Sequence, residues 1–231
     1  MHIEVLDLIE GAKQARGLTV IIDVFRAFST ACYVVQNGAR EIIPVGDADL
    51  AYKLKEKNPK YVLMGERKGK MLPGFDYGNS PTDIQAVDFS GKTVIQTTSA
   101  GTQGFANARD ADELISGSFV NAEAIVDYIR LKSPERLSLV CMGTWAVKPN
   151  AEDTLCAEYI AGRLENRYLD QKEIYNRLKS SKSARIFFDP AVTWAPETDF
   201  DLCLNIGLCN FVLKAEKIED GLLSLKPVYL T

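Results

Sequence analysis

Apolar runs that end in polar turns and continue as helices recur along the chain. Residues 19–24 are an uninterrupted, mostly β-branched run, which is typical of a strand buried on both faces of a parallel sheet. After this run, apolar residues recur at spacings of three and four, which predicts a helix over residues 26–37 that ends before Gly38. The sequence therefore predicts a strand, a short polar turn and a helix between residues 19 and 37.

The same unit is repeated downstream. Further strands are predicted at residues 41–45, 60–64, 92–96, 112–116 and 136–142. Helices are predicted to follow most of these strands, at residues 47–58, after residue 102 through residue 108, at residues 122–131 and from residue 150. Residues 1–8 alternate as an edge strand, with residues 10–17 as its loop. The predicted fold is a layered α/β/α structure with a largely parallel or mixed central sheet.

The pattern weakens beyond residue 162. Residues 165–182 are polar and helical, and residues 187–198, with two prolines and Trp194, predict a loop packed over the rest. The last stretch, residues 211–230, predicts a short C-terminal β-ribbon. We expect a single domain over residues 1–231, with a subdomain from about residue 163 to 231 as the alternative. The apolar ribbon is consistent with a homodimer.

Composition narrows the class of protein. The 231 residues are 46% hydrophobic, enough for a sizeable core, and 27 basic against 31 acidic residues give a net charge of −4 without a basic block. A nucleic-acid partner is therefore not expected. No apolar run approaches the roughly 18 residues of a membrane span, and the amino terminus lacks a signal-peptide pattern, so a cytoplasmic protein is expected.

Histidine and cysteine chemistry is nearly excluded. His2 is the only histidine, which leaves no base for a Ser-His or Cys-His nucleophile. The cysteines are odd in number, widely spaced and set among apolar residues, so buried free thiols are expected in place of disulfides or a zinc site: Cys32, Cys141, Cys156, Cys203 and Cys209.

Acidic residues collect in or beside the strand-end turns: Asp23, Glu66, Asp76, Glu152 and Asp153. Carboxylates that converge without histidine or thiolate are the ligand set that Mg²⁺ prefers, and Mg²⁺ keeps positions for waters and a substrate phosphate. Arg26 and Arg67 in the same turns would bind the phosphate. The residues thus predict a metal-assisted phosphoryl transfer. For each acid taken alone, an ordinary helix cap or dipole partner is the alternative.

The turns also carry hydroxyl and amide side chains. Four hydroxyls and a glycine at residues 97–102 make a phosphate or sulfonate cradle at a helix N-terminus, although the Walker-loop ending is absent. The candidate substrate-binding residues are Ser29, Thr30, Arg67, Asn79, Ser80, Thr97, Thr98, Gly101, Thr102, Ser118 and Asn121.

These turns jointly resemble those of the 2-phosphosulfolactate phosphatase family. The motifs are DVFRAFST at 23–30, GER at 65–67, GFDYGNSP at 74–81, TTSAGT at 97–102, GSFVN at 117–121 and ED at 152–153. The resemblance implies a Mg²⁺-dependent hydrolase that converts 2-phospho-3-sulfolactate to sulfolactate and phosphate, associated with coenzyme M formation. It also implies a fold of α/β layers unlike that of the common phosphatases.

Two departures from the family pattern concern the substrate. Ala100 stands where the family usually has asparagine, which removes one hydrogen bond, and Met142 stands where a small residue is common, which is expected to narrow the pocket.

The expected roles follow from the residues and the resemblance together. Asp23, Arg26 and Glu66 are expected to be catalytic, and Asp23, Asp76, Glu152 and Asp153 to hold Mg²⁺. Asp23 could attack phosphorus directly, or it could bind Mg²⁺ while a metal-bound water attacks. A phosphotransferase on a related phosphorylated acid and a non-catalytic anion-binding protein are the competing functions.

Overall fold

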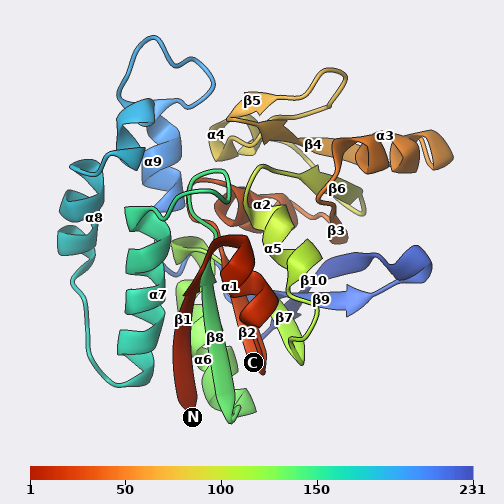
Figure 1. Cartoon of the computed structure of the whole chain (residues 1–231). Coiled ribbons are helices and arrows are strands. Elements are labelled where there is room, and N and C mark those ends of the chain that lie inside the picture. The colour runs from red at the N-terminus through yellow and green to blue at the C-terminus, as the bar shows by residue number, and fades with distance from the viewer. Residues whose placement is uncertain (231) are drawn as a thin grey trace.

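A ten-stranded mixed sheet runs through the computed structural model, which describes residues 1–230 (Figure 1). The strand order is β1-β8-β2-β7-β9-β10-β3-β6-β4-β5. The strands are β1 (His2–Asp7), β2 (Leu18–Ile22), β3 (Glu41–Pro44), β4 (Val62–Arg67), β5 (Lys70–Met71), β6 (Thr93–Thr97), β7 (Glu113–Gly117), β8 (Arg136–Cys141), β9 (Phe211–Lys217) and β10 (Leu223–Tyr229).

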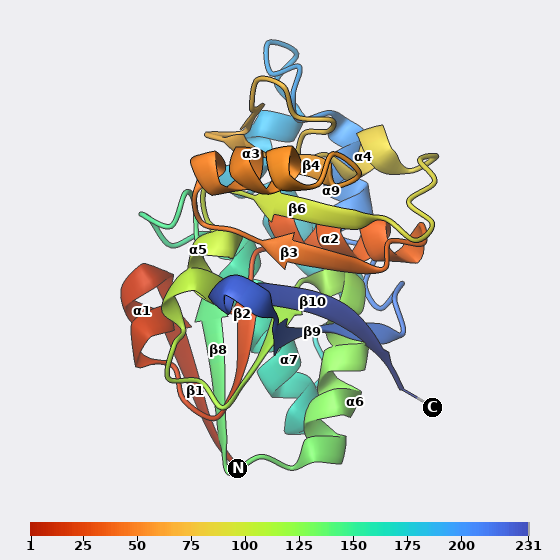
Figure 2. The ribbon, with the colours of Figure 1, turned by 90° about the vertical axis from the view of Figure 1, so that its right-hand side faces the viewer.

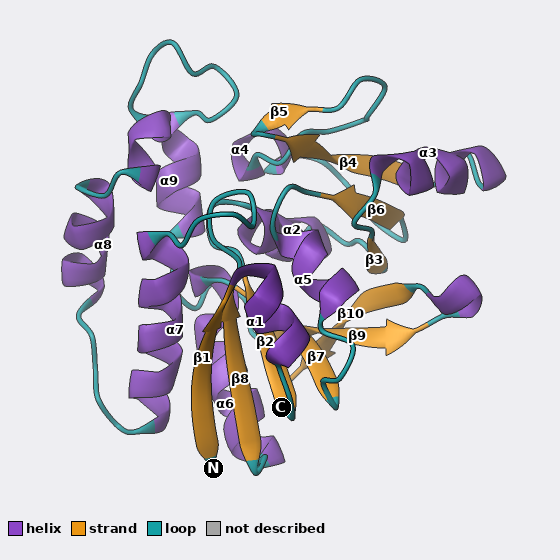
Figure 3. Ribbon diagram, viewed as in Figure 1, coloured by secondary structure: helices purple, strands orange, loops and turns teal. Residues whose placement is uncertain are grey.

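Helices cover both faces of the sheet, as the predicted α/β/α layering requires. Figure 3 shows α1 and α5 in front of the first strands of the sheet and α6 behind them. The helices are α1 (Leu8–Gln14), α2 (Ala27–Gln36), α3 (Ala48–Lys57), α4 (Pro81–Ile84), α5 (Gly101–Asn107), α6 (Ala122–Lys132), α7 (Ala151–Leu164), α8 (Gln171–Lys179) and α9 (Glu197–Cys203).

Strand β2 shows why the apolar run that leads to Asp23 is uninterrupted. Val20 and Ile22 pack into the core formed with α6 and α7, whereas Ile21 packs into the core on the opposite face. Because successive side chains of a strand point to opposite faces, a strand covered by helices on both sides needs apolar residues at every position. The carboxyl end of β2 is thereby fixed inside the protein, with Asp23 just beyond it.

The sheet consists of two parallel groups joined by an antiparallel hairpin. Strands β1, β8, β2 and β7 are parallel to one another, and so are β3, β6 and β4, while β9 and β10 pair antiparallel with each other and with their outer neighbours. Figure 2 shows β3 and β6 lying across the direction of β2 and β8. With this strong twist, the carboxyl ends of both groups reach one region of the molecule.

The C-terminal ribbon is confirmed, but it lies in the middle of the sheet. Val212, Leu213 and Leu225 are fully buried there. The apolar character of the ribbon is therefore explained by burial within one chain and no longer argues for a homodimer, which stays a prediction. The division into a subdomain at about residue 163 also stays a prediction, although β9 and β10 belong to the common sheet.

Two local expectations were wrong. Residues 8–14 form helix α1, where a loop was expected, because Gly11 and Ala12 are small enough to pack closely against the sheet. The charged segment after residue 64 belongs partly to β4, and Glu66 and Arg67 pair with the short strand β5. Alternating charge in a hairpin at the sheet edge carries no apolar periodicity that a sequence pattern could detect.

The cysteine expectation is confirmed: Cys32, Cys141, Cys156, Cys203 and Cys209 are all buried free thiols. Within residues 1–230, no helix has the length and apolar character needed to cross a membrane.

The hairpin should be essential to the stability of the sheet. Leu225 of β10 is fully buried and pairs with Ile42 of β3 at the junction with the second parallel group. Leu225→Ala is expected to lower the free energy of unfolding by about 2–5 kcal/mol, measured by urea unfolding, because it leaves a cavity in the core. Leu131→Ala is the matched control: Leu131 is 73% exposed, and a change within about 0.5 kcal/mol is expected. Equal losses in the two variants would contradict the structural role of the hairpin.

Candidate active site

The carboxyl ends of four strands meet at one cavity of about 540 Å³. Asp23 follows β2, Glu66 lies near the end of β4, Ser99 follows β6 and Gly143 follows β8, and all of them line this cavity. Helix α7 adds Glu152 from its first turn. In open α/β sheets, ligands bind at the carboxyl ends of strands, so this cavity is the candidate active site.

Asp23 lies between the N-termini of two helices. Its Oδ1 accepts a hydrogen bond from the backbone N–H of Ala27 in α2 (3.2 Å), and its Oδ2 accepts one from Gly101 in α5 (2.7 Å). A Cβ at position 101 would lie 2.9 Å from Asp23 Oδ2, so the absence of a side chain permits the close approach. Asp23 does bond the first turn of its own helix, as a cap would. Its second bond, to a helix 78 residues away in the sequence, exceeds what a cap requires.

Glu66 connects two other turns. Its Oε1 accepts a hydrogen bond from the backbone N–H of Ser99 (2.6 Å), and its Oε2 accepts bonds from the backbone N–H of Gly69 (2.6 Å) and the hydroxyl of Ser99 (3.1 Å). The side chain is buried at the wall of the cavity. Glu66 therefore fixes the β4–β5 turn against the turn that precedes α5.

The two acids at the start of α7 have different surroundings. Asp153 is fully buried, does not line the cavity, and accepts hydrogen bonds from the backbone N–H groups of Val24 and Gly143, each at 2.8 Å. Glu152 lines the cavity and accepts a hydrogen bond from the hydroxyl of Ser183. Asp153 thus holds the β2 turn to the loop after β8, whereas Glu152 presents a carboxylate to the cavity.

Burial raises the pKa of Asp23, Glu152 and Asp153. It raises the pKa of Asp23 to about 8, with a further contribution from the nearby Asp153 carboxylate. It raises the pKa of Glu152 to about 7, and the pKa of Asp153 also to about 7 with the help of Glu152. Within residues 1–230, none of the three forms an ion pair with lysine or arginine. When these acids ionise, their negative charge therefore has no cationic partner among the described residues.

Arg26 is the buried cation of the site. It lines the cavity, and its Nη1 donates to Asp199 Oδ2 (2.5 Å) and to the carbonyl of Trp194 (2.8 Å). The guanidinium carbon lies 5.5 Å from the centre of the Trp194 ring. Its Nε and Nη2 have no hydrogen-bond partner in the part of the chain that the structure describes, so they remain available to an anionic ligand.

Most of the hydroxyls expected to bind substrate instead hold the turns in place. Ser29 donates to the carbonyl of Val24, and Thr30 donates to the carbonyl of Asn79. Thr98 and Thr102 bond each other's backbone N–H groups. None of these four hydroxyl residues lines the cavity, whereas Asn79, Ser99 and Ala100 do.

The remaining residues that were expected at the site also form hydrogen bonds within the protein. Thr97 accepts from Arg67, Ser80 caps α4 and donates to Asp199, and Ser118 and Asn121 cap each other before α6. Asp76 does not line the cavity, since its half-exposed carboxylate bonds Lys55 and the backbone of Leu63.

The expectation for Met142 was wrong. Its side chain is fully buried against Gly104 of α5 and does not narrow the cavity. Gly143, the next residue, lines the cavity in its place.

Several cavity residues were not found from the sequence. They come from the loops around α7 and from the C-terminal segment: Lys148, Asn150, Lys182, Ser183, Ile186 and Trp194. The one signal was the loop predicted at residues 187–198, whose Trp194 does pack over the site. Asp199 was also missed, because an acid in the first turn of a helix is expected for the dipole alone.

The oxygen donors suit Mg²⁺ only as a partly open site. In residues 1–230, no three His, Cys, Asp or Glu side chains are placed so that they could together hold a metal ion. Mg²⁺, however, usually takes one or two carboxylates and completes its shell with waters and phosphate. Asp23 and Glu66 fit that requirement, since both face the cavity without an ion-pair partner and the Glu66 charge contributes to the raised pKa of Asp23.

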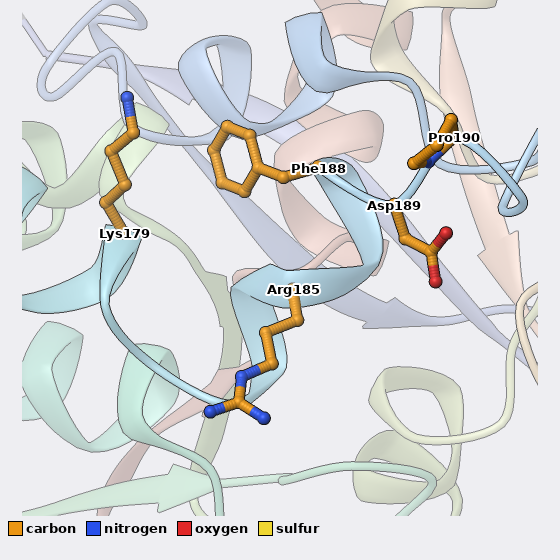
Figure 4. A pocket seen from close by; sticks show the side chains of 5 residues that line it. All are labelled: Lys179, Arg185, Phe188, Asp189 and Pro190. Atoms are coloured by element: carbon orange, nitrogen blue, oxygen red, sulfur yellow. The ribbon is translucent and has the colours of Figure 1, made fainter.

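A second hollow of about 600 Å³ is no alternative to this site. It is lined by Lys179, Arg185, Phe188, Asp189 and Pro190 on the surface near the end of α8. Figure 4 shows the charged ends of Lys179, Arg185 and Asp189 pointing in different directions. Charged groups that do not converge cannot hold one small ligand from several sides.

Comparison with known proteins matches nearly the whole chain to one family. A family model described as 2-phosphosulpholactate phosphatase matches residues 3–217. A Bacillus subtilis protein named "Probable 2-phosphosulfolactate phosphatase" is 33% identical over 207 residues, 88% of this chain and 88% of its own. A protein of the same name from Carboxydothermus hydrogenoformans is 37% identical over 198 residues, 85% of this chain and 78% of its own. One from Thermotoga maritima is 41% identical over 150 residues, 65% of this chain and 63% of its own.

The acids of the site should make stability depend on pH. Asp23, Glu152 and Asp153 have a higher pKa in the folded protein, about 7 to 8, than the value of about 4 expected in the unfolded chain. The folded protein then binds more protons, so the free energy of unfolding falls as pH rises through this window. In chelator, urea unfolding should show a loss of at least ~1 kcal/mol between about pH 5.5 and about pH 8.5.

Glu152→Gln tests whether the buried acids cause this decrease in the free energy of unfolding with pH. It removes one titrating carboxyl and should flatten the pH dependence without abolishing folding. Equal stability of the unaltered protein at both pH values would contradict the uncompensated charge of the cavity.

Proposed function

Because the chain belongs to the 2-phosphosulfolactate phosphatase family, we propose that it hydrolyses 2-phospho-3-sulfolactate to 3-sulfolactate and phosphate. The observation that carries this proposal is the convergence of Asp23, Glu66 and Glu152 on one cavity that also contains Arg26. Such a cavity pairs groups that bind a phosphoryl anion with carboxylates that can hold a cation or move a proton.

Arg26 is the group that would bind the transferring phosphoryl group. Its Nη1 is held by the protein, and its free Nε and Nη2 form the edge that suits two oxygens of a phosphate. The buried Asn79 amide lies in the same wall, and its Oδ1 has no hydrogen-bond partner within residues 1–230. Asn79 therefore retains a polar group for the substrate or its waters.

Glu152 is the group that would accept a proton from the attacking water. Its pKa of about 7 is near the pH at which a general base works best, and only its Oε2 is engaged, by Ser183. The water oxygen forms the new bond to phosphorus, the bond from phosphorus to the C2 oxygen breaks, and the proton that Glu152 accepted passes through cavity water to the released alkoxide, which restores the Glu152 carboxylate. We assign the attack to water and Asp23 to the metal, because a carboxylate oxygen that accepts one backbone hydrogen bond keeps a second lone pair for a cation.

The cofactor of this proposal is Mg²⁺, held by the carboxylates of Asp23 and Glu66. When bound, it would neutralise charge on the phosphoryl oxygens. Asp153 does not line the cavity and would act by holding the turns through its bonds to backbone N–H groups, and Asp76 also lies apart from the cavity.

The other two anionic groups of the substrate, its carboxylate and its sulfonate, need positive partners as well. Lys148 and Lys182 line the cavity and have no ion-pair partner among the described residues. We assign them to these groups. A protein that only bound anions would gain nothing from three unpaired acids in the same cavity, since like charges repel the ligand. The buried free thiols are consistent with the reducing cytoplasm as the place of this reaction.

Asp23→Asn tests the proposal at the centre of the site. The amide keeps the shape of the side chain and one acceptor oxygen, but it removes the charge that would hold Mg²⁺. Turnover of 2-phospho-3-sulfolactate should fall at least ~100-fold, which corresponds to ~2.7 kcal/mol of barrier. Thermal melting should change little, because the loss of one backbone hydrogen bond is offset by the removal of a poorly solvated acid.

Asp76→Asn is the matched control for this experiment. It makes the same chemical change in a carboxylate that does not line the cavity, and near-normal turnover is expected. If Asp23→Asn kept most of its activity, Asp23 would be a cap only and the proposed chemistry would be wrong.

A further inference from the structure

We propose that Asp199 is a positioning residue, which holds the Arg26 guanidinium at the cavity wall and away from the acids of the site. The inference rests on the proposed function only in giving Arg26 a substrate anion to bind. Asp199 belongs to α9, 173 residues from Arg26 in the sequence.

The contact between the two side chains is buried and short. Arg26 is 4% exposed and Asp199 is fully buried, with 2.5 Å between Nη1 and Oδ2. The carbonyl of Trp194 accepts a second bond from the same nitrogen at 2.8 Å. Two protein acceptors thus bind Nη1 of the guanidinium, and Nε and Nη2 have no protein partner in residues 1–230.

Asp199 is itself fixed by three further donors. Its Oδ1 accepts from the hydroxyl of Ser80 (2.8 Å), from the backbone N–H of Thr82 (2.9 Å) and from the hydroxyl of Thr82 (2.6 Å). Both carboxylate oxygens are therefore occupied, and Asp199 does not line the cavity. Arg26 is the one hydrogen-bond partner of Asp199 among the described residues that lines the cavity, so the proposed effect of Asp199 on the reaction passes through Arg26.

The charges of the cavity explain why Arg26 needs this anchor. Asp23, Glu66 and Glu152 line the same cavity without a cationic partner. A free arginine there would be attracted to these carboxylates and would neutralise the groups proposed to hold the metal and move the proton. A buried ion pair is weak support for stability, since an apolar pair of equal volume often serves as well or better. A charge pair retained beside the cavity therefore points to a role in orientation.

A double-mutant cycle separates this role from a structural one. The variants are Asp199→Asn, Arg26→Lys and the double variant, each measured for KM, for kcat and for binding of inorganic phosphate by calorimetry. Each single change should weaken substrate and phosphate binding about 10-fold, the size expected when a charged hydrogen-bonding group is misplaced. If Asp199 acts through Arg26, the double variant should also lose about 10-fold, and not the ~100-fold product of independent effects.

Two further variants distinguish a change in ligand binding from a general loss of stability. Glu41→Gln makes the same carboxylate-to-amide change in a hydrogen-bonded network between β3, β6 and β10, away from the cavity. It should lower the melting temperature while KM and phosphate affinity stay unchanged. Thr82→Val keeps the Asp199 charge and removes one of its donors, so it should raise KM by a smaller factor than Asp199→Asn, and it carries the test if Asp199→Asn does not fold.

The outcomes distinguish this inference from the proposed function. Unchanged KM and phosphate affinity in folded Asp199→Asn, or in Thr82→Val where Asp199→Asn does not fold, overturns the inference, as do multiplicative effects in the cycle. Absence of phosphate binding by the unaltered protein also overturns it, because Arg26 would then have no anion to hold. If the unaltered protein binds phosphate and the cycle is non-additive, but 2-phospho-3-sulfolactate is not hydrolysed, the proposed function fails and the role of Asp199 stands.

Discussion

Three buried carboxylates cross-link the strand-end turns, and the geometry of the site depends on these hydrogen bonds. Asp23 joins the N-termini of α2 and α5, Glu66 joins the β4–β5 turn to the turn after β6, and Asp153 joins the β2 turn to the loop after β8. In each case two backbone N–H groups are the donors. Ionised acids accept such bonds well, but burial raises the pKa of Asp23 and Asp153 and makes the ionisation of these two acids costly. The same residues thus assemble the cavity and give it a need for positive charge.

The elements of the fold could be predicted from the sequence more completely than their arrangement. The run at residues 19–24 has to be buried on both faces, and α2 follows directly from apolar spacing. No local pattern shows that β9 and β10 are inserted between the two parallel groups, because strand neighbours are decided by contacts between distant segments. Helix α1 was missed for a different reason, since its seven residues are too short for a clear period.

The site was predictable where an acid follows a strand directly, and less so elsewhere. Asp23, Glu66 and Glu152 were found from their places at strand and helix ends, and the structure brings them to one cavity. The hydroxyls were predicted less well, because capping and ligand binding favour the same residue types at the same turns. Asp199 could not be paired with Arg26 from sequence, since the contact spans most of the chain. This contact shows that the chain beyond residue 162, where the sequence pattern is weakest, supplies part of the candidate site.

The most direct measurement of the central claim compares phosphate release from 2-phospho-3-sulfolactate, phosphoglycerate, phospholactate and an aryl phosphate in the presence of Mg²⁺. The cavity presents Arg26, Lys148 and Lys182 to a substrate with three anionic groups. The account predicts the highest kcat/KM for 2-phospho-3-sulfolactate, at least about 10-fold above the analogues that lack the sulfonate. Equal hydrolysis of the aryl phosphate, or transfer of the phosphoryl group to an added acceptor instead of water, would contradict it.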